Sequence, residues 1–235
     1  MAFFSPPCPP AAMQLLHNDN DFVAIIKPAG IGVQPDKTGE QCLLDQAELH
    51  LAQSLFVVHR IDRPVSGIVL FAKTKTAAHT LSEQFKERGL TKTYLAVVAN
   101  LPEPTTAELV HYFEKNESKN KSRVYTEDKA GREKGILKYQ VLGSSVRYHL
   151  LEIQLYTGRH HQIRAQLSAI GCPIKGDVKY GAKRGNLDRS IHLHAHKITI
   201  KHPTTGELLR FVADIPSGDT VWSAFLDQIN NPLIP

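Results

Sequence analysis

A polar segment, HRIDRPV, leads directly into an apolar run, and together they make residues 59–74 the first candidate for chemistry. Residues 68–72 are apolar enough to form a strand that is buried on both faces. Asp62 stands just before that strand, between Arg60 and Arg63. A carboxylate at such a place is commonly a turn residue, which is the simpler explanation. The alternative is a nucleophile or base that a nearby arginine keeps ionised and oriented.

A second polar motif, GRHHQIR at residues 158–164, begins a predicted helix and carries such an arginine, Arg164. It lies in a basic window, residues 159–184, that contains six lysines or arginines and one acidic residue, Asp177. The rest of the chain balances in charge, so this window accounts for the formal net charge of +5. A concentrated basic patch indicates a polyanionic partner, although a solvated basic face explains the same excess. Spacing alone does not show whether Asp62 and Arg164 meet.

Other kinds of site have less support. His192, His194 and His196 alternate in a predicted strand, so their imidazoles would share one face and could bind zinc. No carboxylate is close in sequence to complete such a site, and an ordinary half-exposed strand is the favoured explanation. Ser66 is not flanked as in a G-x-S-x-G elbow, and neither a P-loop nor a G-x-G-x-x-G motif occurs. We therefore expect neither a metal nor a nucleotide cofactor.

The composition indicates a folded, soluble protein. With 42% apolar residues in a chain of 235, there are enough apolar side chains for a sizeable core. The three cysteines form no CxxC pair, which favours a reducing compartment over a disulfide scaffold or a zinc ribbon. The chain shows no secretory signal and no apolar run of the roughly 18 residues that a membrane span needs. We expect a cytoplasmic monomer.

The elements that must position the motifs predict an α+β protein with a largely antiparallel sheet, because strands follow one another more often than helices intervene. Apolar runs predict the strands, with a hairpin turn at residues 204–207. Apolar spacing of four residues predicts one helix, and Thr157 and Asp219 are expected to cap two others. The predicted strands are residues 22–26, 67–74, 94–99, 147–156, 191–201 and 208–213, and the predicted helices are residues 76–88, 157–170 and 219–229.

Two segments are expected to stay outside this framework. Residues 1–13 are rich in proline and predict a tail, since proline lacks the N–H that a strand ladder needs. Residues 111–138 carry mixed charges and few large apolar side chains, so we expect an irregular, exposed insertion with at most a short strand. Residues 14–235 are then expected to form a single catalytic domain.

Five blocks, in chain order, resemble the RluA-type pseudouridine synthases. Residues 59–74 resemble the family signature of His-Arg-Leu-Asp, two variable residues, Thr-Ser-Gly and an apolar strand that ends in Ala-Lys-Thr. Together the blocks extend from about residue 23 to residue 216, and five collinear blocks are far more specific than any one motif. The other four are Lys27-Pro28-Ala29-Gly30 with Val33-Gln34-Pro35, Lys92-Thr93-Tyr94-Leu95-Ala96, the stretch from Gly158 to Gly181, and His194-Ala195 with His202-Pro203.

The resemblance implies the pseudouridine synthase fold, a long curved, mainly antiparallel sheet flanked by helices with a basic cleft for RNA. It implies Asp62 as the catalytic aspartate, Tyr94 as the tyrosine that packs against the target base, and Arg164 as the arginine paired with the aspartate. The implied reaction isomerises specific uridines in ribosomal or transfer RNA to pseudouridine, without a metal or nucleotide cofactor. The expected RNA contacts are Arg60, Arg63, Arg159, His160, Gln162, Lys175, Lys179, Lys183 and Arg184.

The chain departs from the family pattern at three positions near the motifs: Ile61 replaces Leu, Val65 replaces Thr, and His160 stands where Thr or Ser is usual. Many relatives carry an amino-terminal S4 RNA-binding module, for which we expect no room here because Phe22 already lies in the catalytic region. A non-catalytic RNA-binding or ribosome-assembly protein on the same fold is the alternative function. The residues leave open which RNA is bound and whether Asp62 would attack covalently or take a ribose proton.

Overall fold

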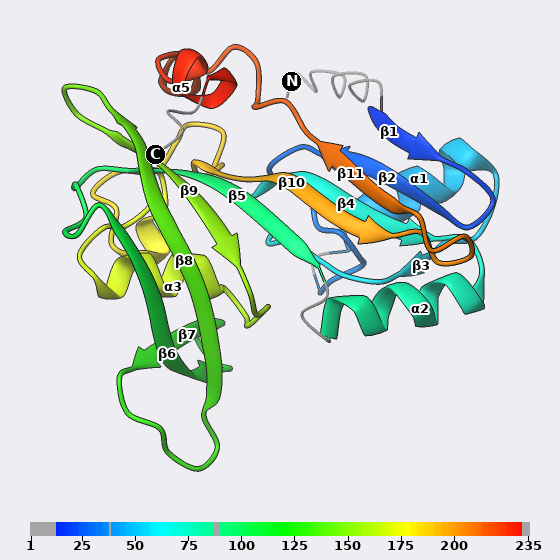
Figure 1. Ribbon diagram of the computed structural model, residues 1–235, viewed down its shortest axis with the longest axis horizontal. Helices are drawn as coiled ribbons and strands as arrows, with labels where there is room; N and C mark the ends of the chain where they lie inside the picture. The colour runs from blue at the N-terminus through cyan, green and yellow to red at the C-terminus, as the bar shows by residue number, and fades with distance from the viewer. Residues whose placement is uncertain (1–12, 38, 87–89, 232–235) are drawn as a thin grey trace, which may run out of the picture.

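The computed structural model describes residues 13–37, 39–86 and 90–231, which form one large sheet with a few short helices (Figure 1). The sheet has 11 strands. Nine follow the order β1-β2-β4-β10-β5-β9-β8-β6-β7, while β3 pairs with β4 and β11 with β10. The described pairings are antiparallel except that of β4 with β10. The expected α+β fold with a mainly antiparallel sheet is confirmed.

The strands are β1 (Leu15–Asn18), β2 (Phe22–Lys27), β3 (Phe56–Val57), β4 (Ser66–Ala72), β5 (Thr91–Val98), β6 (Thr106–Asn116), β7 (Lys121–Tyr125), β8 (Glu133–Ser144), β9 (His149–Leu155), β10 (Leu193–Lys201) and β11 (Leu208–Val212). The helices are α1 (Leu43–Leu51), α2 (Lys75–Lys86), α3 (Gln162–Ala169), α4 (Thr220–Ser223) and α5 (Leu226–Asn230), with a 3₁₀ helix at Val178–Tyr180. No helix in the described ranges is long and apolar enough to cross a membrane.

The strand after Asp62, β4, is buried at every position, as its apolar run predicts. Val69 and Phe71 join an apolar cluster that also contains residues of α1 and α3. Ile68 and Leu70 point to the other face and join a cluster that contains residues of α2. Because helices cover both faces of this part of the sheet, the strand reads as a continuous apolar run rather than an alternating one. The loop that carries Asp62 is therefore anchored to the core.

Gly67 allows β4 and β10 to lie side by side directly behind that loop. Its φ of +117° belongs to the left-handed region, and a Cβ there would overlap the backbone of Ala195. This is the place where the parallel pair forms, with Ala195 opposite Gly67 and His194 opposite Ser66. The Ser-Gly pair of the motif thus joins the Asp62 loop to a second strand.

The expectation of an irregular insertion at residues 111–138 is wrong. The segment belongs to β6, β7 and β8, which form the end of the sheet farthest from β1 (Figure 1). Burial alternates along parts of β6 and β8, where Phe113, Leu137 and Tyr139 are buried between more exposed neighbours. An antiparallel ribbon of this kind needs few large apolar residues, since only one of its faces packs on the core. Its mixed charges are the solvent-facing half of an alternating pattern.

The helix expected from Thr157 starts later, at Gln162. The Thr157 hydroxyl oxygen instead accepts a hydrogen bond from the Ile136 N–H at 2.8 Å, and the hydroxyl lies 2.7 Å from the side-chain oxygen of Gln162. The residue before the helix is His161, in the left-handed conformation with φ of +54°. The start of α3 is therefore set by contacts with β8, which the helical spacing of its apolar residues does not encode.

The remaining predicted elements are present, with local differences in where they begin and end. Asp219 caps a helix as expected, accepting hydrogen bonds from Val221 N and Trp222 N, but the segment divides into α4 and α5 and Leu226 is exposed. Helix α1 and the short strands β1 and β3 were not predicted. The proline-rich segment falls, apart from Met13, outside the described residues, as does the expected end of α2 near Gly89.

Candidate active site

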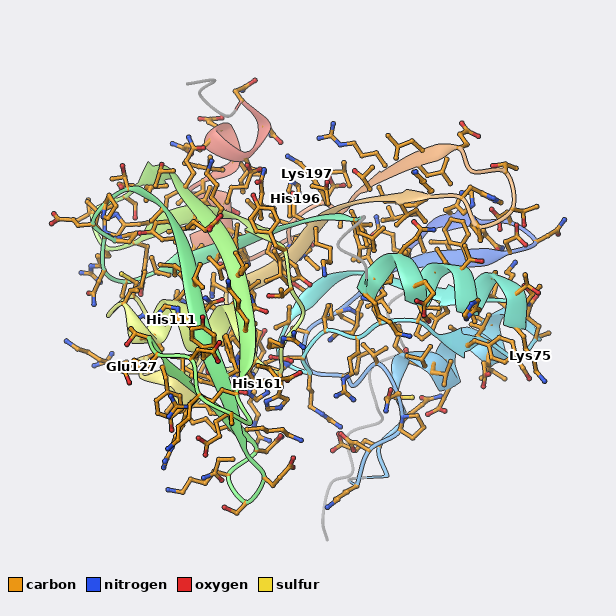
Figure 2. The ribbon with its side chains drawn as sticks, turned by 60° about the horizontal axis from the view of Figure 1, so that its bottom comes forward. Lys75, His111, Glu127, His161, His196 and Lys197 are labelled. Atoms are coloured by element: carbon orange, nitrogen blue, oxygen red, sulfur yellow. The ribbon has the colours of Figure 1, made fainter. Side chains whose placement is uncertain are left out.

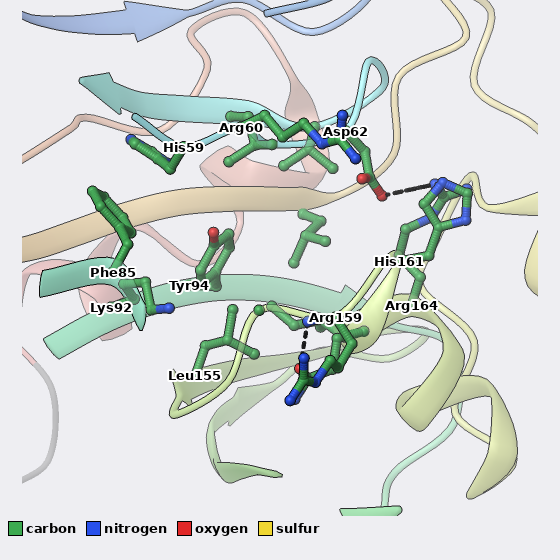
Figure 3. A pocket seen from close by; sticks show the side chains of 16 residues that line it. His59, Arg60, Asp62, Phe85, Lys92, Tyr94, Leu155, Arg159, His161 and Arg164 are labelled. Atoms are coloured by element: carbon green, nitrogen blue, oxygen red, sulfur yellow. Dashed lines mark hydrogen bonds and ion pairs between the residues drawn. The ribbon is translucent and has the colours of Figure 1, made fainter. Parts of the chain in front are cut away.

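Asp62 lies in a pocket of about 250 Å³ whose walls come from distant parts of the chain (Figure 3). The loop before β4 supplies Asp62, β5 supplies Tyr94, and α3 supplies Arg164. Apolar side chains, among them Val65 and Leu155, complete the lining. The three residues that the family resemblance implies as catalytic are thus brought to one place, although 102 positions separate Asp62 from Arg164.

Lys27, at the end of β2, holds the Asp62 loop in position. Its side chain is fully buried and donates to the carbonyl oxygens of Pro28 at 2.8 Å, Ile31 at 2.9 Å and Arg63 at 3.1 Å. The Gly30 N–H donates to the same Arg63 carbonyl at 2.8 Å. Burial lowers the pKa of Lys27 to about 7, although the charge of Asp62 opposes this shift. The Lys-Pro-Ala-Gly block therefore fixes the backbone immediately after Asp62.

Arg164 connects Asp62 to a second, deeply buried carboxylate. Its Nη1 donates to Asp62 Oδ2 at 2.9 Å, while Nε and Nη2 donate to the two oxygens of Asp177 at 2.7 and 2.9 Å. Only 1% of the Asp177 side chain and 5% of the Arg164 side chain are exposed, against 26% for Asp62. Burial alone would lower the pKa of Arg164, but Asp177 and Asp62 outweigh it and raise that pKa. A forked, bidentate pair fixes the guanidinium plane, so Arg164 presents one N–H to Asp62 in a defined direction.

Tyr94 lies in the middle of the pocket, with Arg164 on one side and Lys92 on the other (Figure 3). It is partly buried on β5, where it pairs with Ile153 of β9 and Ala195 of β10. Burial raises the pKa of its hydroxyl, and the charge of Asp62 adds to the increase. The hydroxyl is therefore protonated at every physiological pH, and the ring is an aromatic surface beside the carboxylate (Figure 3).

His161 is a site residue that the sequence reasoning missed. Its Nε2 lies 3.7 Å from Asp62 Oδ2, and its Nδ1 lies 3.0 Å from the Tyr180 hydroxyl oxygen. That oxygen accepts a hydrogen bond from the Ser122 N–H at 2.9 Å, and of the two acceptors for its own proton, His161 Nδ1 is nearer than the Ser122 carbonyl at 3.5 Å. Burial, helped by the Arg164 charge, lowers the pKa of His161 to about 2, so the imidazole is neutral. With Nδ1 as acceptor, the ring directs an Nε2–H toward Asp62.

His160, which was expected to contact RNA, lies against His161. Its ring stacks on that of His161 with centroids 3.8 Å apart, and its Nδ1 lies 2.9 Å from the Ser122 hydroxyl. These contacts are with the protein itself, and the expected RNA contact stays a prediction.

The residues expected to contact RNA fall into three groups. Arg60, Lys183 and Arg184 are exposed, and Arg60 lines the pocket. Arg63 pairs with Asp36 and Glu40, and Arg159 pairs with Glu133 at 2.7 Å. The exposed Lys179 donates to the Asn120 carbonyl, and Lys175 donates to Asn186 outside the pocket lining.

Gln162 does not fit the expected RNA contact. Its side chain is buried, and its amide nitrogen donates to the Ile136 carbonyl at 3.1 Å and to the Gln166 side chain at 3.0 Å. Its amide oxygen accepts from the Arg159 N–H at 3.0 Å. Every polar group of this side chain is thus bonded to the protein, because it ties α3 to β8. Gln162 lines the pocket, but its side chain stabilises the site through bonds within the protein.

The three histidines of the alternating motif bind the protein itself. His192 Nε2 lies 3.1 Å from Asp219, His194 Nδ1 lies 2.8 Å from the Ser66 hydroxyl, and His196 Nδ1 lies 2.7 Å from the Ala213 carbonyl. Figure 2 shows His196 on β10, well separated from His161. In the described ranges, no group of three or more histidine, cysteine, aspartate or glutamate side chains is arranged to hold a metal ion.

Comparisons with known proteins agree with this geometry. A model of the RNA pseudouridylate synthase family matches residues 21–169. The chain belongs to the RNA pseudouridylate synthase family. Members of this family are isomerases that act on uridine in RNA, which confirms the expected class of enzyme and reaction. The expected pseudouridine synthase fold is confirmed as well: human RNA Pseudouridylate Synthase Domain Containing 4 matches with a TM-score of 0.70 at 26% identity over 92% of both chains.

Two curated relatives illustrate the range of the family. An uncharacterised RNA pseudouridine synthase of Synechocystis is 31% identical over 218 residues, which cover 87% of this chain and 66% of that protein. The protein named tRNA pseudouridine synthase C of Salmonella typhi is 30% identical over 237 residues, which cover 92% of this chain and 89% of that protein. The chain thus spans just under two thirds of the first relative and most of the second.

Proposed function

We propose that the protein converts specific uridines of a transfer RNA to pseudouridine, with Asp62 as the catalytic residue. The observation that carries the proposal is the arrangement of Asp62: its carboxylate borders a pocket and receives a directed hydrogen bond from a buried, bidentately held arginine. Such a carboxylate is fixed in direction, as a nucleophile or a base requires.

The family reaction breaks the bond between uracil N1 and ribose C1′ and forms a bond between C5 and C1′. The C5 proton is released and N1 gains a proton, so no electrons or groups are exchanged with a cofactor. Asp62 starts this sequence either by attacking the nucleotide covalently or by removing a proton from ribose. Arg164 and His161 direct N–H groups toward the same carboxylate oxygen and so orient it for either route.

Tyr94 and the apolar lining have a second task. A uridine in folded RNA is stacked, and turning it out costs a few kcal/mol, which stacking on an aromatic ring and phosphate contacts offset. The Tyr94 ring offers that surface next to Asp62. Val65, Leu155 and Leu193 exclude water around it, which strengthens the interaction of Asp62 with Arg164. Residues 14–235 would act as one catalytic unit, because the site draws on strands from across the sheet.

Transfer RNA is proposed as the substrate class because the relative from Salmonella typhi, named as a tRNA pseudouridine synthase, matches over most of both chains. The exposed cations Lys183 and Arg184, with Arg60 in the lining of the pocket, are the residues we propose for binding its backbone. Contacts of this kind are independent of sequence, so the target uridine would be selected by the shape of the RNA.

The test is release of tritium from transcripts labelled at uridine C5. Transfer RNA and ribosomal RNA are supplied in parallel to the wild type and to Asp62→Asn. The proposal is supported if the wild type releases tritium from transfer RNA and Asp62→Asn does not. Release from ribosomal RNA alone would overturn the substrate class and keep the reaction. Tight binding of RNA with no release from either would favour an RNA-binding protein without turnover.

A further inference from the structure

The end of the pocket remote from Asp62 contains a cation that the proposed chemistry does not use. Lys92 lies there with His59 and Phe85, on the opposite side of Tyr94 from His161 and Arg164 (Figure 3). The rings of His59 and Phe85 stack with centroids 4.2 Å apart, and Lys92 Nζ lies 5.8 Å from the Phe85 centroid. The ammonium lies 4.0 Å from the place where a Cβ on Gly158 would stand. It is therefore held between β5 and the loop before α3.

Lys92 differs from three of the neighbouring arginines because it has no acidic partner among the described residues. Arg63, Arg159 and Arg164 each pair with a carboxylate. Within the described part of the chain, Lys92 forms no ion pair, and its ammonium donates no hydrogen bond. Burial lowers its pKa, which shows that the surroundings do not compensate the charge. An ammonium that is partly desolvated and unpaired is costly unless a ligand supplies the anion.

His59, beside Lys92, is a neutral member of the lining. Its Nε2 accepts a hydrogen bond from the Leu70 N–H at 2.9 Å, so its proton is on Nδ1. Burial, with a contribution from Lys92, lowers the pKa of His59 to about 3. This end of the pocket therefore contains one positive charge, without a carboxylate among the lining residues there.

We infer that Lys92 binds a phosphate adjoining the uridine that enters the pocket, an inference that rests on the proposed function. Uracil and ribose are neutral, so the phosphodiester is the one group of the bound nucleotide that can neutralise an ammonium. Lys92 and Tyr94 alternate on β5 and line the same pocket. A nucleotide whose base stacks on Tyr94 and whose ribose meets Asp62 thus has Lys92 within a side-chain length. Lys92 would hold the backbone of the extruded nucleotide while Asp62 acts on the sugar.

The test compares Lys92→Gln and Lys92→Arg with Lys75→Gln. Lys75 is exposed at the outer end of α2, far from His161 in Figure 2, so its substitution removes the same charge away from the pocket. Binding of the substrate transcript is measured against salt in an Asp62→Asn background, and turnover in the wild-type background. Lys92→Gln should weaken binding about tenfold and reduce the slope of log K against log salt by about 0.7. Lys92→Arg should keep the slope, and Lys75→Gln should change neither quantity.

A chemical substitution in the RNA makes the test specific. A neutral methylphosphonate at the linkage before or after the target uridine should weaken binding to Asp62→Asn as much as Lys92→Gln does, and should have no further effect on the double variant. If Lys92→Gln lowered turnover at saturating RNA and left the salt slope unchanged, Lys92 would act on the base and the inference would be wrong. If the wild type isomerised no RNA while the salt slope still fell with Lys92→Gln, the phosphate site would stand and the proposed function would fail.

Discussion

The two ends of the pocket differ in whether their buried charged groups are paired within the protein. At the Asp62 end, the buried groups are bonded to the protein: Arg164 pairs with both Asp62 and Asp177, and His161 lies 3.0 Å from the Tyr180 hydroxyl. At the other end, Lys92 has no acidic partner among the described residues. Groups that are fully paired are rigid and ready for chemistry. A group that stays unpaired depends on a ligand. The comparison therefore separates the residues that carry out the reaction from one that holds the substrate.

The largest effect is expected at the rigid end, from Asp62→Asn. The amide can still accept a hydrogen bond from Arg164, but it is neither a nucleophile nor a base, so turnover should fall at least about a thousandfold. RNA binding should stay within about threefold of the wild type, because 26% exposure leaves Asp62 a minor part of the surface. The measurement is pseudouridine formed per enzyme under single-turnover conditions. Residual turnover within tenfold of the wild type would exclude Asp62 as the catalytic residue.

Asp177→Asn should cost stability as well as activity. It leaves the buried Arg164 charge with half of its compensation, and breaking a buried pair typically costs about 3–5 kcal/mol of unfolding free energy. Glu133→Gln is the matched control, since it breaks the exposed pair with Arg159 and should cost less than about 1 kcal/mol. Urea unfolding at pH 7 measures both. Equal losses for the two variants would contradict the difference that burial is expected to make.

Both ends contain an imidazole that burial keeps neutral, and this predicts how stability depends on pH. The pKa is about 2 for His161 and about 3 for His59, against 6.5 in the unfolded chain. Because the unfolded chain binds the protons first, their contribution to stability is complete above pH 6.5 and is lost as pH falls toward the folded values. Each histidine should add up to about 1.4 kcal/mol per pH unit to the slope between pH 6 and 4.

Single substitutions test that assignment. His59→Asn and His161→Asn should each flatten the pH dependence of the unfolding free energy by about one proton. His79→Asn removes an exposed histidine from α2 and should leave the slope unchanged. A slope that none of the three alters would show that other groups control the acid transition.

The smallest effect on turnover is expected from Tyr180→Phe, which removes the hydroxyl that orients His161 and accepts from the Ser122 N–H. Losing one oriented hydrogen bond corresponds to about 1 kcal/mol, so turnover at saturating RNA should fall about five- to tenfold while KM stays unchanged. Tyr139→Phe is a fitting control, because its hydroxyl donates to the Pro104 carbonyl and Tyr139 is absent from the pocket lining. Equal turnover in the two variants would mean that His161 needs no orientation from Tyr180.

Several elements could be predicted from the sequence because their signals are local. The continuous apolar run of β4 predicted a strand covered on both faces. The turn at residues 204–207 predicted the hairpin of β10 and β11. The β6–β8 ribbon was missed because its alternating pattern is sparse and charged on the exposed side. His161 was missed for a different reason: the backbone at φ +54° places its imidazole beside Asp62, and spacing does not reveal that conformation.

The sequence by itself determined the family blocks, the catalytic candidates and the unbalanced basic charge, since these depend on residue identity and order. The tertiary structure alone decided the contacts between blocks. Gln162 is buried and bonds to Ile136 because β8 lies against α3. Asp177 is the second partner of Arg164 because a loop folds back on that helix. Whether a charged group serves the protein or remains for a ligand depends on neighbours that are distant in the chain. That is why the role we propose for Lys92, an ordinary lysine in its strand, could be inferred only from the assembled pocket.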